Sequence, residues 1–454
     1  MSGTGVVVMA AGLGTRMRSK LPKVLHPVCG EPMAWHVLEA ARGLEPERIV
    51  VITGHQAERV EAELAAPGVV FVRQEVLDGT AGAVRRAEEV LRGCDRVLVL
   101  NGDAPLVTTE LLERLLAAGQ GRPLAFVTCR VEEPGRLGRV VRDADGAPAA
   151  VVEAAEWEGP AGPAEINAGQ YVFAGSWLWS RLPGVPLSAK GEYYLTHLIG
   201  LAAREGTPAG TVEATPEEAL GVDDRVKLAE AEAVMRRRIL ERHMVAGVTI
   251  EDPATTWIGA RVELAQDVVI RAGSRLEGAT RVDEDAVIGP NTTLRNARVG
   301  AGTRVEASVI EDSEVGARCR VGPFAHVRGG AVIGEGCELG NYAEVKNSRL
   351  GRGVKMHHFS YLGDADVGDG ANIAAGTITC NFDGVAKHRT VIGARAFIGC
   401  DTMLVAPVRV GDDAFTATGS VVTKDVGDGE SVKGVPARPF ERKAPGRGLP
   451  AGHE

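Results

Sequence analysis

A glycine-rich segment near the amino terminus carries residue types that could bind a triphosphate. The segment Met9-Ala10-Ala11-Gly12-Leu13-Gly14-Thr15-Arg16-Met17 follows the apolar run 6–9, and Lys23 follows in Leu21-Pro22-Lys23. Glycines and small side chains let backbone N–H groups reach phosphate oxygens, because a Cβ atom would obstruct the approach. Arg16 and Lys23 add positive charge. The segment lacks the Walker pattern, which argues against an ATP hydrolase, and a plain strand-to-helix turn is the alternative interpretation.

A carboxylate follows a second apolar run. Asp103, in Asn101-Gly102-Asp103-Ala104-Pro105, comes after the predicted strand 97–100. Carboxylate oxygens are ligands that Mg²⁺ prefers, so Asp103 is a candidate metal ligand. A helix cap is the alternative for an isolated aspartate in such a place.

The last third of the chain contains a second set of polar and basic residues among regularly spaced aliphatic ones. Its members are Arg328, Lys346, His358, Tyr361, Asn372, Asn381 and Lys387. Cationic side chains suit a phosphate group, and imidazole, with a pKa near neutrality, suits proton transfer. A solvated face of scattered charges is the alternative interpretation.

The elements that must position the first set alternate between predicted strands and helices. The strands, expected to be buried on both faces, are Val6–Met9, Arg48–Thr53, Val69–Arg73, Val97–Leu100 and Leu124–Thr128. The helices are Met33–Gly43, Gln56–Ala65, Gly82–Leu91 and Glu110–Ala118. This alternation predicts an α/β domain whose parallel sheet binds a nucleotide at the carboxyl ends of its strands. The long helical pattern Asp223–Met244 predicts a linker helix.

A six-residue repeat must position the second set. Aliphatic residues recur at Ile258, Leu264, Ile270, Leu276, Val282, Ile288 and Leu294, and the register resumes after a phase slip at Val299. This pattern predicts a parallel β-helix of three-sided coils with the aliphatic side chains inside, whereas a sandwich of short strands would not hold the register. Residues about eighteen positions apart then lie on adjacent coils, so Arg328 and Lys346 should stack. Cys380–Thr390 breaks the register and should protrude as a loop.

Composition narrows the classes of function. A formal net charge of −9 argues against nucleic-acid binding. No long apolar stretch and no basic amino-terminal signal are present, which argues against a membrane or secreted protein. Seven scattered cysteines without a C-x-x-C pair suggest neither disulfides nor zinc, so a cytoplasmic location is expected. The 58 glycines among 454 residues fit a repetitive architecture together with phosphate-binding turns.

Both halves resemble known transferases. The first half resembles the sugar-nucleotide pyrophosphorylases on the segments 9–17, 21–23, 77–80, 101–105, 165–169 and 191–196. The second resembles an acetyltransferase on the segments 339–348, 357–365 and 372–384. In this order, from residue 5 to about residue 440, the chain resembles the family of bifunctional N-acetylglucosamine-1-phosphate uridylyltransferases / glucosamine-1-phosphate N-acetyltransferases.

The patterns and the resemblance together imply an architecture. It comprises an α/β, Rossmann-like nucleotidyltransferase domain with a mixed, mostly parallel sheet at 1–222, a linker helix at 223–247, a left-handed parallel β-helix at 248–443 and a disordered tail at 444–454. The resemblance also implies a homotrimer. The implied function is acetylation of glucosamine 1-phosphate by acetyl-CoA, followed by Mg²⁺-dependent transfer from UTP to N-acetylglucosamine 1-phosphate. The products are pyrophosphate and UDP-N-acetylglucosamine, a precursor of peptidoglycan and lipopolysaccharide.

The resemblance assigns roles at the first site. Arg16 and Lys23 would be catalytic, and Asp103 and Asp223 would bind Mg²⁺. The substrate contacts would be Met9, Ala10, Ala11, Gly12, Lys23, Gln74, Gly79, Thr80, Asn101, Gly102, Gly138, Glu153, Asn167 and Asp223. Asp223 departs from the asparagine usual in the family, which predicts tighter Mg²⁺ binding, and Asn101 stands where an aromatic residue is frequent.

Roles at the second site follow in the same way. His358 would be the general base, whereas its neighbour His357 is expected to be structural. Arg328, Lys346 and Lys387 would hold the sugar phosphate, and Tyr361 and Asn372 would position the sugar. The acetyl-CoA site would be lined by Ala375, Asn381, Phe382, Cys400 and Thr418, of which Phe382, Cys400 and Thr418 depart from the usual residues.

Two alternatives belong to other classes of function. One is a nucleotidyltransferase for glucose or mannose 1-phosphate whose β-helix regulates and oligomerises; such relatives lack the polar cluster His358–Tyr361. The other is a non-catalytic sugar-nucleotide sensor, which would keep Arg16, Lys23, Asp103 and His358 for binding alone.

Overall fold

The computed structural model describes residues 3–154, 156–188 and 191–440. The predicted tail, 444–454, lies outside the described residues. The chain divides into two compact units between Met235 and Arg236. The 21-residue helix α8 (Arg225–Val245) spans this division and is where the linker helix was predicted.

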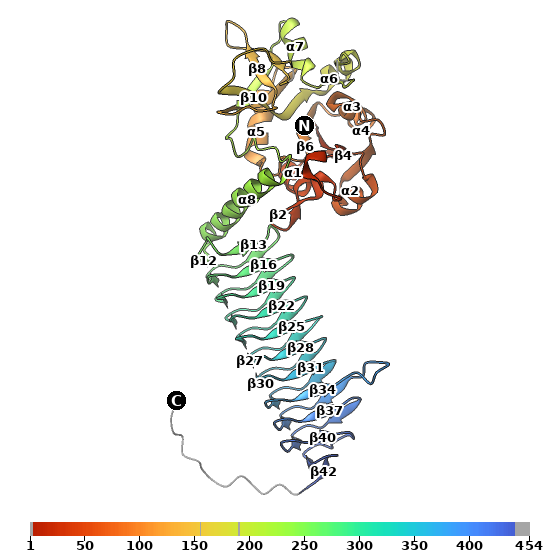
Figure 1. Ribbon diagram of the computed structural model, residues 1–454, viewed down its shortest axis with the longest axis vertical. Helices are drawn as coiled ribbons and strands as arrows, with labels where there is room; N and C mark the ends of the chain where they lie inside the picture. The colour runs from red at the N-terminus through yellow and green to blue at the C-terminus, as the bar shows by residue number, and fades with distance from the viewer. Residues whose placement is uncertain (1–2, 155, 189–190, 441–454) are drawn as a thin grey trace. The chain divides into compact units, whose positions relative to one another are not determined.

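The amino-terminal unit is built on a mixed sheet (Figure 1). The strand order is β11 (Gly210–Glu213), β7 (Leu124–Val131), β10 (Ala164–Ala174), β6 (Arg96–Asn101), β1 (Thr4–Ala10), β4 (Arg48–Thr53) and β5 (Val69–Arg73). Only β10 runs antiparallel to its neighbours in this order. A hairpin of β8 (Arg139–Arg142) and β9 (Pro148–Val152) pairs with β10. The predicted mixed, mostly parallel sheet is confirmed.

Helices cover both faces of this sheet, because alternate side chains of each strand enter different cores. Val7 of β1 packs with residues of α3 (Thr80–Arg85), α4 (Glu88–Leu91), α6 (Gly175–Arg181) and α7 (His197–Arg204). Val6 and Val8 pack with residues of α1 (Met33–Arg42), α2 (Ala57–Leu64) and α5 (Thr109–Ala118). Strands β1 and β6 thus lie between two packed layers of helices.

Two expectations about these elements are wrong. Strand β5 was expected to be buried on both faces, but none of its residues is fully buried, because it is the edge strand and pairs only with β4. The helix expected over Gly82–Leu91 is two short helices, α3 and α4. Arg86 and Ala87 donate to the carbonyls of Ala83 and Val84, which closes the first helix with tighter i-to-i+3 bonds.

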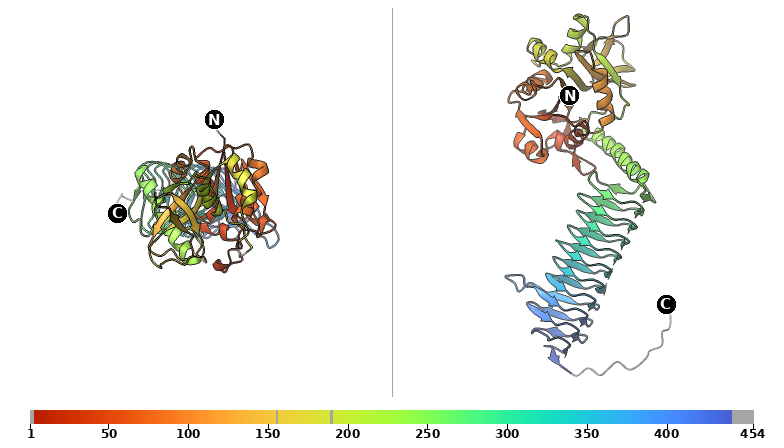
Figure 2. Two further views of the ribbon diagram at one scale, coloured as in Figure 1. Left: turned by 90° about the horizontal axis from the view of Figure 1, so that it is seen from above. Right: turned by 180° about the vertical axis from the view of Figure 1, so that it is seen from behind.

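The carboxyl-terminal unit is a parallel β-helix whose three sheets each take one short strand per coil (Figure 2). One sheet runs from β12 (Thr249–Ile250) to β42 (Arg438–Pro439), another from β13 (Trp257–Ile258) to β40 (Val421–Val422), and the third from β14 (Glu263–Leu264) to β38 (Val408–Val410). Within them, the repeated aliphatic residues face inward, as Leu276, Leu294 and Ile310 do without exposed surface. The expectation from the hexapeptide register is confirmed.

Glycine after the aliphatic residue serves the close stacking of coils more than the corners. A Cβ atom on Gly340 would lie 2.1 Å from the carbonyl oxygen of His357 on the next coil. Many corners with positive φ are instead non-glycine residues such as Asp364 and Tyr342. The predicted loop also exists: β34 (Ile378–Cys380) ends and β35 (Thr390–Ile392) begins around a segment that stands out from the coils in Figures 1 and 2.

Candidate active sites

The segment after β1 forms a turn shaped to receive phosphate. A Cβ atom on Gly12 would meet no protein atom within 4 Å, so the turn leaves open space where a ligand could approach the backbone. Gly14 has a positive φ of 59°, and a Cβ there would lie 2.5 Å from the Cβ of Lys23. Glycine at position 14 therefore permits both the left-handed turn and the close packing of Lys23 against it.

Two carboxylates face the cations of this turn. Lys23 forms an ion pair with Asp103, and Nη1 of Arg16 lies 2.7 Å from Oδ2 of Asp223. The Val222 N–H donates to the carbonyl of Asp103 at 2.9 Å, which ties the two carboxylate-bearing segments together. Both carboxylates are partly exposed, at 26% for Asp103 and 22% for Asp223. Their carboxylate oxygens are hard donors that ligands can reach from solvent. They fit a divalent cation that also binds phosphate oxygens.

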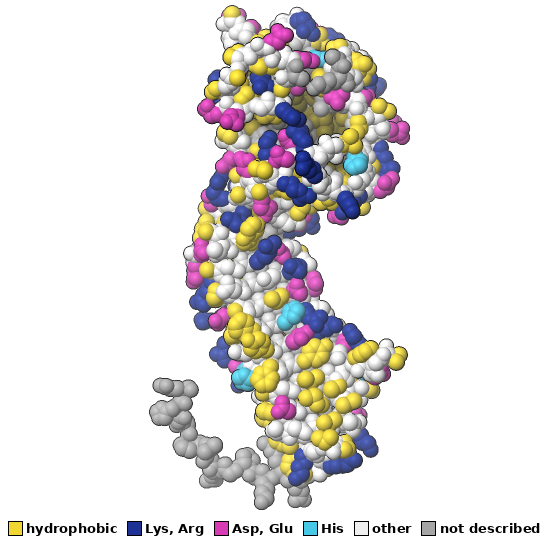
Figure 3. Space-filling model, in the orientation of Figure 1, with side chains coloured by type: hydrophobic (Ala, Val, Ile, Leu, Met, Phe, Trp, Pro, Cys, Tyr) yellow, Lys and Arg dark blue, Asp and Glu magenta, His cyan; other side chains and the backbone are white. Residues whose placement is uncertain are grey.

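Two cavities meet at these residues. One, of about 460 Å³, is lined by Met9, Ala10, Ala11, Gly12, Gln74, Gly79 and Thr80 among others. The other, of about 530 Å³, is lined by Arg16, Gly138, Glu153, Asn167, Asp223 and Lys227 among others. The residues that line both cavities are Met9, Lys23, Thr80, Asn101, Asp103 and Tyr194. Figure 3 shows Lys and Arg side chains beside a hollow on this unit. The predicted nucleotide and sugar contacts thus divide between two cavities with a common wall.

Hydrogen bonds hold polar residues in place in each of the two cavities. Gln74 is buried, and its Nε2 donates to Oδ1 of Asp78 at 2.8 Å and to the Gly79 carbonyl at 3.2 Å. In the other cavity, Thr196 donates to Oε1 of Glu153 at 3.1 Å. The Asn167 N–H donates to the carbonyl of Gly138.

Two glycines allow close approach beside Asn101. A Cβ on Gly169 would lie 2.1 Å from Nδ2 of Asn101, so glycine there admits the Asn101 side chain. Gly102 also approaches closely, since its Cβ would meet the Met9 carbonyl.

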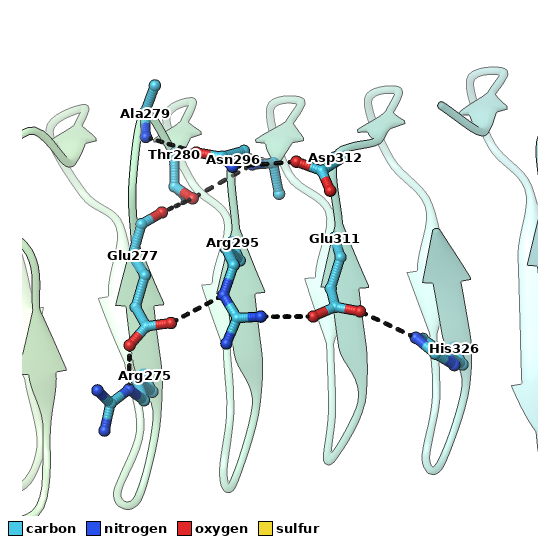
Figure 4. Close-up of polar contacts among 10 residues, drawn as sticks. Arg275, Glu277, Ala279, Thr280, Arg295, Asn296, Glu311, Asp312 and His326 are labelled. Carbon is cyan, nitrogen blue, oxygen red and sulfur yellow. Dashed lines mark hydrogen bonds and ion pairs between the residues drawn. The ribbon is translucent and has the colours of Figure 1, made fainter. Parts of the chain in front are cut away.

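A ladder of charges leads to the second cluster along one face of the β-helix. Glu277, Arg295 and Glu311 occupy successive coils, with Arg295 bonded to Glu277 at 3.0 Å and to Glu311 at 2.9 Å (Figure 4). His326 then contacts Glu311 at 3.3 Å. Alternating charge stabilises neighbouring coils, because each side chain lies between opposite charges.

The alternation ends where the predicted phosphate-binding residues begin. Arg328 of β25 (His326–Arg328) is in register with Lys346 of β28 (Glu344–Lys346), as the spacing predicted. Oε1 of Glu344 accepts from Nε of Arg328 at 2.9 Å. The neighbouring ammonium of Lys387, together with Arg328, holds the pKa of Lys346 below its usual value. Cations that repel one another in this way form a suitable site for an anion.

His358 begins a column of residues at one corner. It ends β30 (Lys355–His358), and the register carries its position to Ala375, Cys400 and Thr418 on the three following coils. Backbone bonds join the column, since Asp401 donates to the Ala375 carbonyl and Gly419 to that of Cys400. Tyr361 opens the next strand, β31 (Tyr361–Gly363). The structure therefore places the predicted base in one column with three of the predicted acetyl-CoA contacts, one on each of the next three coils.

Other predicted residues lie elsewhere. Asn372 of β33 (Asn372–Ile373) is in register with Lys355, three residues before His358, or about 10 Å along the strand. Asn381 is buried at the base of the protruding loop, whereas Phe382 is exposed on it. His357 contacts Oε2 of Glu338 at 3.0 Å, in line with a structural role.

Sequence reasoning missed three residues at these clusters. Lys227 lies 3.5 Å from Oδ2 of Asp223, which precedes α8 by two residues; the i and i+4 spacing within the predicted helix 223–244 could have suggested this pair. Glu344 holds Arg328, as described above. Asp364 contacts residues on the coils before and after it. Asp364 lies within the segment 357–365 that carries the resemblance, but its spacing to Asn381 equals an ordinary coil spacing, so the sequence assigned it no role.

Comparisons with known proteins agree with this division. Residues 6–198 match the model of the MobA-like NTP transferase domain, and residues 312–347 match that of the bacterial transferase hexapeptide (six repeats). The bifunctional protein GlmU of Streptomyces avermitilis is 44% identical over 434 residues, which cover 93% of this chain and 90% of that protein. The proteins of the same name from Brevibacillus brevis and Burkholderia vietnamiensis are 44% and 41% identical. Those alignments cover 94% and 97% of this chain, and 94% and 100% of those proteins.

Fold, clusters and comparisons define a class: a nucleotidyltransferase joined to a hexapeptide-repeat acyltransferase. Within that class, the chain belongs to the GlmU family of bifunctional enzymes. As expected from its sequence, it is an enzyme with two transferase domains that act on small molecules, one of them a nucleotide. Within the described part of the chain, no helix is long and apolar enough to cross a membrane.

Proposed function

We propose that the β-helix unit acetylates glucosamine 1-phosphate with acetyl-CoA, and that the amino-terminal unit then joins N-acetylglucosamine 1-phosphate to UTP. The observation that carries the proposal is that each unit has its own cluster of cations beside polar side chains, and that the two clusters share no residue. Both reactions act on anionic sugar phosphates, which such clusters suit.

In the amino-terminal unit, a sugar-phosphate oxygen attacks the α-phosphorus of UTP and pyrophosphate leaves. Lys23, on the wall common to both cavities, offsets the charge of the reacting phosphates, and Arg16 does so from the sugar side. Mg²⁺, held by Asp103 and Asp223, would further stabilise the charge on the phosphate oxygens. Among the residues that the structure describes, no three His, Cys, Asp or Glu side chains group as a metal site, so phosphates would complete the ligand set.

Gln74 reads the base. Because its Nε2 group is engaged by Asp78 and Gly79, its carbonyl oxygen remains to accept a hydrogen bond. Uracil offers an N–H donor at N3 where cytosine has an acceptor. This orientation favours UTP over CTP.

In the β-helix unit, the sugar amine attacks the thioester carbonyl, the C–S bond breaks and CoA leaves as the thiol. His358 takes the proton from the amine, which imidazole does well near neutral pH. Arg328, Lys346 and Lys387 hold the 1-phosphate, and Tyr361 positions the sugar. The column of Ala375, Cys400 and Thr418 lines the path of acetyl-CoA from the same corner, with Asn381 and Phe382 beside it.

The active unit is a homotrimer in the cytoplasm. Asn372 lies at the other end of the strand face, about 10 Å from the position in register with His358, so we assign it to the site of a neighbouring copy. Exposed apolar side chains near the cluster, including Ile378, Val405 and Phe382, suit packing against that copy. No disulfide joins any of the seven cysteines, all of which lie within the described residues, as a reducing compartment would require.

The test measures CoA release and pyrophosphate release separately, with glucosamine 1-phosphate, acetyl-CoA and UTP supplied. His358→Ala should lower the rate of acetylation by at least about a hundredfold and spare uridylyl transfer, whereas Asp103→Ala should do the reverse. Glucose or mannose 1-phosphate accepted in place of the amino sugar would favour the first alternative. Binding without turnover would favour the sensor.

A further inference from the structure

Asp364 links three consecutive coils beside the acetyl-transfer cluster. It occupies the corner between β31 and β32 (Ala365–Val367) with a positive φ of 51°, and only 8% of it is exposed. Its Oδ1 accepts from Nδ2 of Asn347 on the preceding coil at 2.5 Å. Its Oδ2 accepts from Nδ2 of Asn381 on the following coil, also at 2.5 Å.

The backbone of Asp364 fastens the protruding loop as well. Its N–H donates to the carbonyl of Lys346, and its carbonyl accepts from the N–H of Thr390, both at 3.1 Å. Asn381 begins the loop and Thr390 follows it. Asp364 therefore holds both ends of the segment that carries Phe382 and Lys387.

The charge of Asp364 sets the direction of the Asn381 amide. Burial raises the pKa of this carboxyl, but hydrogen bonds from Asn347 and Asn381, with the charges of Lys387 and Lys346, more than offset that effect and lower the pKa overall. A carboxylate only accepts hydrogen bonds, so Asn381 must turn its Nδ2 toward Asp364. Its Oδ1 is then the atom left for a ligand.

Gly363 brings this amide beside Tyr361. A Cβ on Gly363 would lie 2.2 Å from the Tyr361 hydroxyl oxygen and 2.8 Å from Nδ2 of Asn381. The absence of a side chain lets the hydroxyl and the amide converge on one spot.

From this geometry we propose that Asp364 is a positioning residue for acetyl transfer. It keeps Oδ1 of the Asn381 side chain turned toward an N–H donor of the bound substrates. The proposal rests on the proposed function. That donor is either the sugar amine or an amide of the acetyl donor, and kinetics distinguish the two.

The experiment is a double-mutant cycle in the full-length enzyme with Asp364→Ala, Asn381→Ala and the double variant. Wild-type acetylation is measured first, because its absence would refute the proposed function rather than this inference. Asp364→Ala should lower kcat/KM for acetylation about tenfold or more, with uridylyl transfer unchanged. The double variant should lose no more than Asn381→Ala alone, because one residue acts through the other. A raised KM for glucosamine 1-phosphate identifies the sugar amine as the donor, and a raised KM for acetyl-CoA identifies the acetyl donor.

Two further variants separate positioning from folding. Asn347→Ala removes the other partner of Asp364 and leaves the bond between Asp364 and Asn381 in place, so kcat/KM should stay within about twofold. Asp364→Asn keeps the shape and tolerates the left-handed backbone, but it replaces one acceptor with a donor and should also lower kcat/KM. Additive losses in the cycle, full activity of Asp364→Ala, or an equal loss in Asn347→Ala would overturn the inference.

Discussion

Asp223 meets two cations, Arg16 at 2.7 Å and Lys227 at 3.5 Å, while it also lines the cavity assigned to the sugar phosphate. A carboxylate here has two functions. It balances the charge of the cleft before ligands arrive, and in the proposed reaction it would offer a negative oxygen to Mg²⁺ afterwards. An amide would offer a neutral oxygen and no ion pair.

Asp223→Asn should therefore weaken Mg²⁺ binding, because a charged ligand is replaced by a neutral one. We expect the Mg²⁺ concentration for half-maximal uridylyl transfer to rise several-fold, with a lower maximal rate. Titration of the rate with MgCl₂ at constant ionic strength measures the change.

The neighbouring residue supplies the control. Oδ1 of Asp224 accepts from the N–H groups of Val226 and Lys227, as a helix cap does. Asparagine caps helices equally well, so Asp224→Asn should leave the Mg²⁺ dependence unchanged. If Asp223→Asn behaves like Asp224→Asn, Asp223 is not a metal ligand.

The sequence predicted the positions and contacts of some residues and not those of others. The stacking of Arg328 on Lys346 follows from a regular coil, so the spacing predicted it correctly. Asp364 lies in the segment 357–365, but its contacts were not predicted, because they depend on a corner conformation and on two amide partners that the residue types alone do not reveal. The distance of Asn372 from His358 could not be predicted either. That distance depends on where each residue falls along a strand of the coil, which the six-residue period leaves open.

The elements were predictable where one periodicity persists. The hexapeptide register persists along all three sheets of the β-helix, so every coil supports the same interpretation. Strand β5 was misjudged because its apolar composition resembles that of a central strand, and only the strand order reveals an edge. The break between α3 and α4 depends on local hydrogen bonding that hydrophobic spacing does not encode.

The close stacking of coils leads to a further prediction about these elements. Gly340→Ala would place a methyl group 2.1 Å from the His357 carbonyl oxygen. The coil that carries His358 must shift, so we expect a loss of stability of about 1–3 kcal/mol and reduced acetylation. Chemical denaturation and the CoA-release assay test both effects.

Gly427→Ala is the matched control. Its Cβ would meet only a side-chain oxygen of Glu430 at 3.5 Å, which is an ordinary contact, and its φ is not positive. Stability and acetylation should be unchanged. A Gly340→Ala protein as stable as this control would show that the coils can separate without cost.

At the scale of the whole molecule, the proposed trimer makes each acetylation site depend on two chains. Chains that carry His358→Ala and chains that carry Asn372→Ala should both be impaired alone. Co-expressed, they form mixed trimers in which some sites combine an intact His358 with an intact Asn372, so acetylation should recover to a fraction of the wild-type rate.

Sedimentation of the co-expressed, purified variants verifies that they form trimers. The two variants purified separately and then mixed, under conditions in which subunits do not exchange, give the baseline rate of acetylation. No recovery in verified mixed trimers would mean that both residues serve the same chain. A monomeric enzyme with full activity would contradict the assembly itself.

The protruding loop has a consequence for how such a chain can change over time. Tyr361 pairs with Ile378 seventeen positions later, Ile378 pairs with Met403 twenty-five positions later, and Met403 pairs with Val421 eighteen positions later. The additional residues thus lie within a single coil, and the next coil resumes the register. A solenoid of this kind can accept new segments at its corners without disturbing the stacking that stabilises it. Lengthening or replacing the loop is therefore a route by which evolution or an engineer could alter the acyl donor while retaining the scaffold.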